Sequence, residues 1–213
     1  MHFQTLLTLV GDEPVFETSF LLAGNANPDQ IRLQLNRWIN SGKVIQWRRG
    51  VYSLASPYQK ETPHPFVIAN HLQPASYVSM QTALSFYGMI PDVAQAVTSV
   101  GSCRPERITN PLGSFIFRHI KPAAFFGYTL VPVTAKQKAI IAEPEKALLD
   151  LLYLQPGSDS LPFLAELRLQ DIENLDASKL TSMADRFQSP KMQRAVELLL
   201  KLMENEKGVH VSL

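Results

Sequence analysis

The sequence of 213 residues has little cysteine, little excess charge and no long apolar run. Its single cysteine, Cys103, excludes an intrachain disulfide framework and a multi-cysteine zinc site, and it fits a reducing compartment. Twenty lysine and arginine residues against 19 aspartate and glutamate residues give a formal net charge of +1, which by itself indicates no polyanionic partner. Apolar runs such as residues 147–154 fall far short of the roughly 20 residues that cross a membrane. We therefore expect a soluble cytoplasmic protein without a membrane partner.

The sequence also lacks the motifs that mark metal, nucleotide and nucleophile sites. It contains neither HExxH nor CxxC, and neither of the glycine-rich phosphate loops GxxxxGK[ST] and GxGxxG. The carboxylates of Glu143, Glu145 and Asp150 suggest an acid–base group, but the first two fall at the start of an expected helix, where the helix dipole explains them. We therefore expect no enzymatic activity, no cofactor and no metal ion.

Residues 1–56 show the pattern of three helices followed by two short strands. The third helix has the clearest signals, because Asn27 can cap its first amides, Pro28 suits its first turn and Gly42 is a typical stop. Its apolar residues recur at helical spacing and predict one buried stripe. They are Ile31, Leu35, Trp38 and Ile39.

Residues 43–54 have the composition of a β-hairpin. β-Branched and aromatic residues stand on both sides of the turn Arg48-Arg49-Gly50, where glycine supplies a positive φ. Trp38 and Trp47 are predicted to pack in the core rather than to stack on nucleobases. Three helices followed by such a hairpin predict a winged helix-turn-helix whose wing is the hairpin.

The same region concentrates positive charge. Residues 27–49 hold five basic residues and one acidic residue, so this window carries +4 while the rest of the chain is slightly acidic. Basic groups can neutralise phosphates, and arginine, asparagine and glutamine can read base edges in a major groove. We predict that the third helix selects the sequence and that Arg48 and Arg49 contact the DNA backbone or the minor groove. The predicted DNA-binding residues are Arg32, Gln34, Asn36, Arg37, Asn40, Lys43, Arg48 and Arg49.

An alternative interpretation keeps the winged helix but removes the DNA. Such domains also serve protein interaction or ligand sensing, and the arginines would then be a solvated face without DNA-binding activity. Salt dependence separates the two interpretations, because phosphate contacts release counterions and weaken steeply as salt rises.

Residues 57–65 contain three prolines among polar residues and predict a linker. Residues 66–213 mix helical and strand patterns and end in helices, so the expected fold class is α+β with a mixed α/β C-terminal domain. The expected elements of that domain are helices over 65–73 and 80–87, strands over 94–101, 114–119 and 127–133, and helices over 143–154 and 161–202.

A second basic group runs through the middle of the chain and is interrupted only by Glu106. If the fold brings these side chains together, they can meet an acidic protein surface or a nucleic acid through charge complementarity. A dispersed, solvated set explains them equally well. The group consists of Arg104, Arg107, Arg118, Lys121, Lys136 and Lys138.

Three short stretches stand in a recognisable order. They are Arg-Gly-Val-Tyr at 49–52, Tyr-Val-Ser-Met-Gln-Thr-Ala-Leu at 77–84 with Tyr-Gly at 87–88, and Ala-Glu-Pro-Glu-Lys-Ala-Leu-Leu-Asp at 142–150. In this order and spacing the chain resembles the AbiEi family of type IV toxin–antitoxin antitoxins and transcriptional regulators. The resemblance covers roughly the first 155 residues.

This resemblance implies a bacterial protein whose N-terminal winged helix binds double-stranded operator DNA and represses its own operon. It also implies that the C-terminal domain counters a nucleotidyltransferase toxin encoded alongside, and in a type IV system the antitoxin need not contact that toxin. Arg48 and Arg49 match the family pattern for DNA contact. The resemblance assigns antitoxicity to no residue, and stretches 77–84 and 144–152 are expected to be structural.

Overall fold

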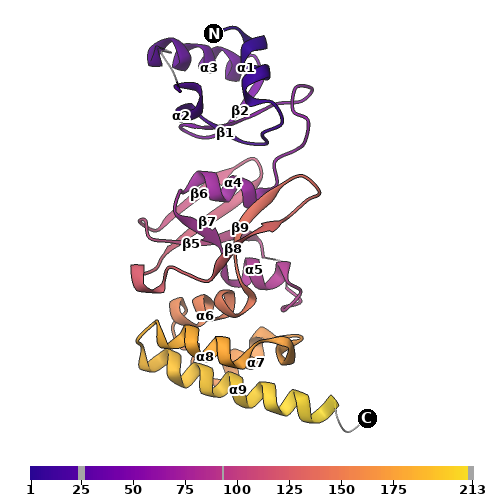
Figure 1. The fold of residues 1–213 in the computed structure, drawn as a ribbon, viewed down its shortest axis with the longest axis vertical. Helices are drawn as coiled ribbons and strands as arrows, with labels where there is room; N and C mark the ends of the chain where they lie inside the picture. Colours follow the sequence, from indigo (N-terminus) through magenta and orange to yellow (C-terminus); the bar gives the residue numbers. More distant parts are fainter. Residues whose placement is uncertain (24–26, 93, 211–213) are drawn as a thin grey trace. The chain divides into compact units, whose positions relative to one another are not determined.

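The computed structural model describes residues 1–23, 27–92 and 94–210, with side chains up to residue 205. Over these residues the protein is a mixed α+β structure with two sheets, which confirms the α+β part of the predicted fold class (Figure 1). None of the helices in these ranges has the length and the apolar character needed to cross a bilayer.

The chain divides into two compact units. The first unit is Met1–Pro74 with Pro132–Lys138, and the second is Ala75–Val131 with Ala139–Leu213. The first unit therefore includes residues 57–65, which the sequence predicts as a linker, and a short segment from the second half of the chain.

Helices and a small antiparallel sheet make up the first unit. The sheet has the order β1-β3-β2, with Phe16 opposite Tyr52 and Val44 opposite Leu54. Its elements are α1 (Phe3–Val10), β1 (Phe16–Glu17), α2 (Thr18–Leu21), α3 (Pro28–Asn40), β2 (Val44–Arg48), β3 (Val51–Leu54) and α4 (Pro65–Leu72).

Helix α3 begins and ends where the sequence predicts. The side chain of Asn27 accepts hydrogen bonds from the amides of Asp29 and Gln30, at 2.9 and 3.2 Å, so two of the free N–H groups are satisfied. Gly42 follows the helix with a φ of 69°. The predicted stripe is also confirmed, because Ile31, Leu35 and Trp38 are buried and Ile39 packs against them in part.

The predicted hairpin is present as β2 and β3. Gly50 has a φ of 91° in its turn, a conformation that residues with a Cβ rarely adopt. Trp47 is 7% exposed and its indole N–H donates to the hydroxyl of Ser53 at 3.1 Å, while Trp38 lies in the core. Both tryptophans are therefore packing residues, as predicted.

The second unit contains a six-stranded mixed sheet of order β6-β7-β5-β4-β9-β8. Strands β5 and β7 pair in parallel, as do β4 and β9, while β4–β5 and β6–β7 are antiparallel. The strands are β4 (Ser76–Val78), β5 (Ala96–Gly101), β6 (Glu106–Asn110), β7 (Gly113–His119), β8 (Tyr128–Pro132) and β9 (Lys138–Ala142).

Helices form further layers beside this sheet. Helix α5 packs on β5, α6 packs on α5, and α8 and α9 pack on α6 (Figure 1). Of the segments expected from the sequence, 161–202 is divided by turns rather than helical throughout. The helical elements are α5 (Met80–Phe86), η1 (Pro122–Ala124), α6 (Pro144–Leu154), α7 (Leu161–Leu167), η2 (Ile172–Asn174), α8 (Ala177–Asp185) and α9 (Pro190–His210).

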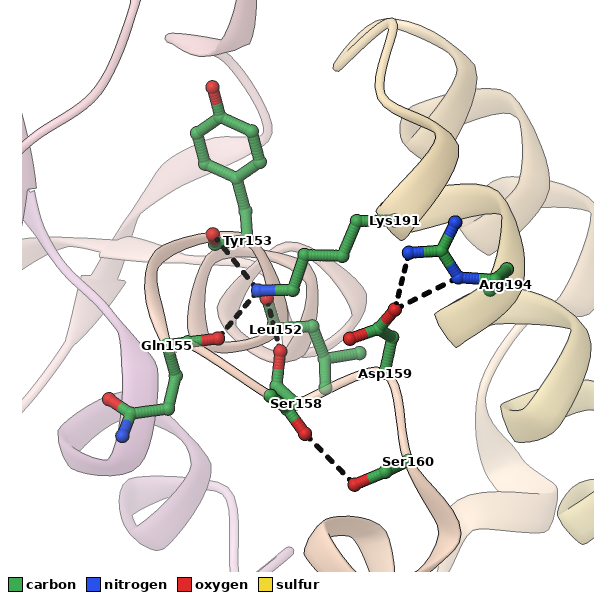
Figure 2. Close-up of polar contacts among 9 residues, drawn as sticks. Leu152, Tyr153, Gln155, Ser158, Asp159, Ser160, Lys191 and Arg194 are labelled. Carbon is green, nitrogen blue, oxygen red and sulfur yellow. Dashed lines mark hydrogen bonds and ion pairs between the residues drawn. The ribbon is translucent and has the colours of Figure 1, made fainter.

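The end of α6 is capped entirely by side chains. The carbonyl groups of residues 152–155 have no partner within the helix, and three side chains donate to them. Ser158 donates to the first, Lys191 to the second and fourth, and Arg118 to the third (Figure 2 shows the first, second and fourth). Two cations at a helix C-terminus also interact favourably with the helix dipole.

Candidate nucleic-acid interface

Helix α3 presents a mostly polar outer face, which also carries Leu33 at 52% exposure. Arg32, Asn36 and Asn40 are exposed along this face. Arg32 Nη1 lies 3.2 Å from a carboxylate oxygen of Asp29, and the two side chains are 62% and 90% exposed. An ion pair so exposed contributes little, so the guanidinium can exchange this partner for a phosphate or a base edge.

A hollow of about 760 Å³ connects this face to the turn of the hairpin. It brings Arg32 and Asn36 of α3 to the same surface as Arg49, which follows β2. Side chains at the start of α2 complete its wall. The lining residues are Thr18, Ser19, Leu22, Arg32, Asn36, Gln46, Arg49, Gly50 and Tyr52.

Six of the nine lining residues were not among the predicted site residues, and two of these, Gln46 and Tyr52, contact each other. Gln46 is exposed on β2, and its amide nitrogen lies 3.5 Å from the hydroxyl of Tyr52. That hydroxyl also accepts from the amide of Gly50 at 3.4 Å, which ties the tyrosine to the turn. A signal for Gln46 existed in the sequence, because it is a polar residue between the apolar positions of a predicted strand.

The two arginines of the turn have different surroundings. Arg49 lines the hollow, whereas Arg48 Nη1 donates to the backbone carbonyl of Leu72, the last residue of α4, at 2.9 Å. Arg48 therefore connects the hairpin to α4. Lys43 is half-buried, and its ammonium lies 4.8 Å from the centre of the Phe3 ring.

The remaining predicted residues of α3 do not line the hollow. Gln34 is half-buried and Arg37 is exposed, and their spacing of three places both on the flank away from Arg32 and Asn36. Arg37 lies in the last turn, where a cation complements the helix dipole. The eight predicted residues therefore form several groups rather than one surface.

Comparisons with known proteins concern the fold. No family model and no curated protein sequence matches the chain. A solved structure does match. The crystal structure of the RV2827C protein from Mycobacterium tuberculosis aligns with a TM-score of 0.53 at 15% identity, over 94% of this chain and 76% of that chain. At such an identity the likeness shows a shared fold alone.

Half of the second basic group lies in or beside the outer strands of the larger sheet. Arg104 and Arg107 are exposed, at and just before β6. Arg118 on β7 is half-buried and donates to the end of α6, as described above. These three residues share a region of the sheet but not a common role.

Two of the other three residues, Lys121 and Lys136, have a partner. Lys121 is half-buried and its ammonium donates to the backbone carbonyl of Phe187. In the first unit, Lys136 Nζ lies 3.3 Å from a carboxylate oxygen of Glu61, and Lys138 is exposed at the start of β9. Lys121 and Arg118 therefore contribute to folding through backbone carbonyls.

A buried polar cluster occupies the second unit between β4 and α6. The Asp150 carboxylate accepts from the hydroxyls of Tyr77 and Ser79, at 3.0 and 2.8 Å. The ammonium of Lys146 pairs with that carboxylate, donates to the Tyr77 hydroxyl at 2.8 Å and lies 5.1 Å from the ring centre of Phe126. Every charge and hydroxyl of the cluster is therefore hydrogen-bonded.

Burial governs the ionisation of this cluster. It raises the pKa of Asp150 and of Tyr77 and lowers the pKa of Lys146, although the opposite charge of each partner works against both shifts of the ion pair. The Lys146 and Asp150 side chains are 0% exposed, so a substrate cannot touch them in this conformation. The cluster therefore stabilises the fold.

Within the described ranges, no group of three histidine, cysteine or acidic side chains could hold a metal ion.

Proposed function

We propose that residues 1–56 form a winged helix-turn-helix that binds double-stranded DNA. The observation that carries the proposal is the hollow that joins Arg32 and Asn36 of α3 to Arg49 of the β2–β3 turn. A major groove about 12 Å wide admits one helix, and α3, with 13 residues and a polar outer face, suits that groove. In this arrangement the hairpin is the wing.

We infer different tasks for these side chains. Asn36 reads adenine and Arg32 reads guanine or a phosphate, because these pairs match in hydrogen-bond geometry. Arg49 contacts the sugar–phosphate backbone. Arg48 is a positioning residue, because its hydrogen bond to Leu72 holds the wing.

The proposal extends to regulation. The protein is a cytoplasmic, non-enzymatic autorepressor of its own operon and an antitoxin that counters a nucleotidyltransferase toxin. The similarity of stretches 49–52, 77–84 and 142–150 to the AbiEi family supports this extension. Two of these stretches supply Tyr77, Ser79, Lys146 and Asp150 to the buried cluster, so a family resemblance at these positions reflects the fold of the second unit.

DNA binding is tested with the full-length protein and the DNA upstream of its own gene. Fluorescence anisotropy at several salt concentrations gives the affinity and the number of phosphate contacts. We expect Arg32→Ala to weaken binding about 10- to 100-fold and Arg49→Ala to reduce the salt slope by about 1. Lys201→Ala, which removes an exposed cation of α9, is the matched control. If Arg32→Ala, Arg49→Ala and Lys201→Ala all bind DNA as tightly as the unmodified protein, the assigned interface is wrong.

Antitoxicity needs a separate test. The gene next to this one is expressed with and without the protein, and growth and transcription of the operon are recorded. We expect the Arg32→Ala/Arg49→Ala variant to lose repression yet still rescue growth, because a type IV antitoxin acts without relying on the operator contact. Toxicity that the protein never relieves would remove the antitoxin half of the proposal and leave the DNA half intact.

A further inference from the structure

A second hollow lies wholly within the second unit. It has a volume of about 540 Å³, in the range of sites that hold small molecules. Four segments contribute to it: α5, the approach to β5 with β5 itself, the residue after α6, and α7. The lining residues are Gln81, Ile90, Asp92, Ala94, Gln95, Ala96, Thr98, Gln155, Phe163, Glu166 and Leu167.

Three carboxamides from separate segments line this hollow. The side chains of Gln81, Gln95 and Gln155 form no hydrogen bond with any residue of the described ranges, and the hydroxyl of Thr98 forms none either. Figure 2 shows that the carboxamide of Gln155 points away from Lys191, while its backbone carbonyl accepts from that lysine. Each carboxamide offers two N–H donors beside a carbonyl acceptor.

Hydrogen bonds that do not involve the glutamine side chains hold the wall of the hollow together. The hydroxyl of Thr82, the neighbour of Gln81, donates to the carbonyl of Ala96 at 3.1 Å and accepts from the amide of Thr98 at 2.9 Å. These two bonds hold α5 against the start of β5. The Thr82 hydroxyl and its two backbone partners are therefore hydrogen-bonded, whereas the three glutamine side chains of the lining bond to no described residue.

Helix α7 closes another side with apolar groups. Phe163 and Leu167 lie in the lining, and Ile90, which is 6% exposed, lies beneath. The end of α7 is joined to the segment after α5, because Arg168 Nη2 lies 2.8 and 2.9 Å from the two carboxylate oxygens of Asp92. One aromatic ring, an aliphatic floor and several free carboxamides are the groups that recognise a flat polar heterocycle.

The charge of the lining restricts the ligand further. It contains the carboxylates of Asp92 and Glu166 and neither lysine nor arginine, counted over the described residues. A phosphate would find no lysine or arginine in the lining and would meet the carboxylate of Glu166, since the Arg168 beside the hollow is already paired with Asp92. The ligand class is therefore uncharged or weakly cationic.

We propose that this hollow binds a free nucleobase or nucleoside. Amide side chains pair bidentately with the donor and acceptor atoms on a base edge, and aromatic side chains stack on the face of any base. Gln81, Gln95 and Gln155 read the edge and Phe163 supports the ring. This site is independent of DNA binding by the first unit.

Isothermal titration of the full-length protein with adenosine, guanosine, cytidine and uridine tests the proposal. We expect at least one nucleoside to bind with a Kd below about 1 mM, and its 5′-monophosphate to bind about 10-fold more weakly. Gln81→Ala and Gln155→Ala should each weaken binding about 10-fold, the factor for roughly one lost hydrogen bond. Gln193→Ala, an exposed glutamine of α9, is the control.

Several results would overturn the proposal. No heat from any nucleoside up to about 1 mM removes it, as does binding that Gln81→Ala and Gln155→Ala leave unchanged. Tighter binding of the monophosphate contradicts the charge argument. Binding that is lost in Arg32→Ala/Arg49→Ala instead places the nucleoside on the DNA surface. Thermal melting of each variant without ligand shows whether it is folded.

Discussion

The two units place charge in opposite environments. In the second unit Lys146 and Asp150 are 0% exposed and bind each other and two hydroxyls, whereas in the first unit Arg32 and Asp29 are 62% and 90% exposed and share one contact of 3.2 Å. An enclosed pair cannot lose one member without leaving an unpaired charge, but an exposed pair changes partner at little cost. The buried pair is suited to stabilising the fold, and the exposed pair is suited to a surface that binds phosphate.

The largest effect is expected from breaking the enclosed pair. Asp150→Ala leaves the Lys146 ammonium buried without a carboxylate and should lower the free energy of unfolding by about 3–5 kcal/mol. Urea unfolding measures this change, and Asp185→Ala at an exposed carboxylate of α8 is the control. Asp150→Asn serves if the alanine variant fails to fold. A loss below about 1 kcal/mol for both variants would contradict the role of the pair.

Removing both charges together should be less harmful. We expect Lys146→Met/Asp150→Leu to destabilise the protein less than Asp150→Ala does, by about 2 kcal/mol, because neither charge then stays buried alone. A double-mutant cycle with Lys146→Met and Asp150→Leu as single variants measures the coupling. Losses that simply add would show that the two side chains stabilise the fold independently.

The next largest loss of stability is expected at the N-terminus of α3. Asn27→Ala removes the acceptor for the amides of Asp29 and Gln30, so about 1 kcal/mol of stability should be lost. Asn40→Ala, at an exposed asparagine of the same helix, is the control. Equal urea midpoints for the two variants would show that the Asn27 cap does not stabilise the protein.

A pH effect of similar or smaller size is expected at α4. His64 Nδ1 accepts from the amide of Phe66 at 3.2 Å, and burial lowers the pKa of this imidazole below its ordinary value of about 6.5. Its cap is therefore complete above about pH 6.5 and is lost as pH falls below that value, since the unfolded chain binds the proton more readily. His64→Asn keeps a cap that does not titrate. The protein should lose up to about 1 kcal/mol more than this variant between pH 7.5 and 5.5, and parallel unfolding curves would contradict the assignment.

The smallest stability effect is expected at the exposed pair. Asp29→Asn removes an ion pair at the protein surface and should change the free energy of unfolding by about 0.5 kcal/mol or less. The same change frees Arg32 and removes a negative charge beside it, so affinity for DNA should rise on the function proposed above. Anisotropy titrations at low and high salt compare the two, and weaker binding would place Asp29 itself in the interface.

Local signals predicted the first unit well. Asn27, Pro28 and Gly42 act on their own neighbours, and the stripe of α3 repeats within a few turns, so each could be read from adjacent residues. The turn of the hairpin followed from Gly50 in the same way. The sequence also placed Arg32, Asn36 and Arg49 among the candidates, and these are the three that share the hollow.

Contacts between distant residues were not predictable. Strand β4 has three residues and exists because it pairs with β5 and β9, and β6 and β9 were missed for related reasons. Lys146 lies in a helix whose charges suggest solvent exposure, but its hydroxyl partner Tyr77 is 69 positions away. Likewise, nothing near Arg48 indicates that its guanidinium donates to a carbonyl 24 positions later. No local pattern encodes such pairs.

The hydrogen bond from Arg48 to Leu72 ties the hairpin turn to the end of α4. Leu72 ends α4, and β4 of the second unit begins at Ser76, so only three residues separate the anchor of the turn from the next sheet along the chain. Arg48 therefore ties the turn, and the neighbouring Arg49, to the backbone at the point where the chain leaves the first unit. The anchor of the turn thus lies next to one of the three points where the backbone passes between the units, the others being 131–132 and 138–139.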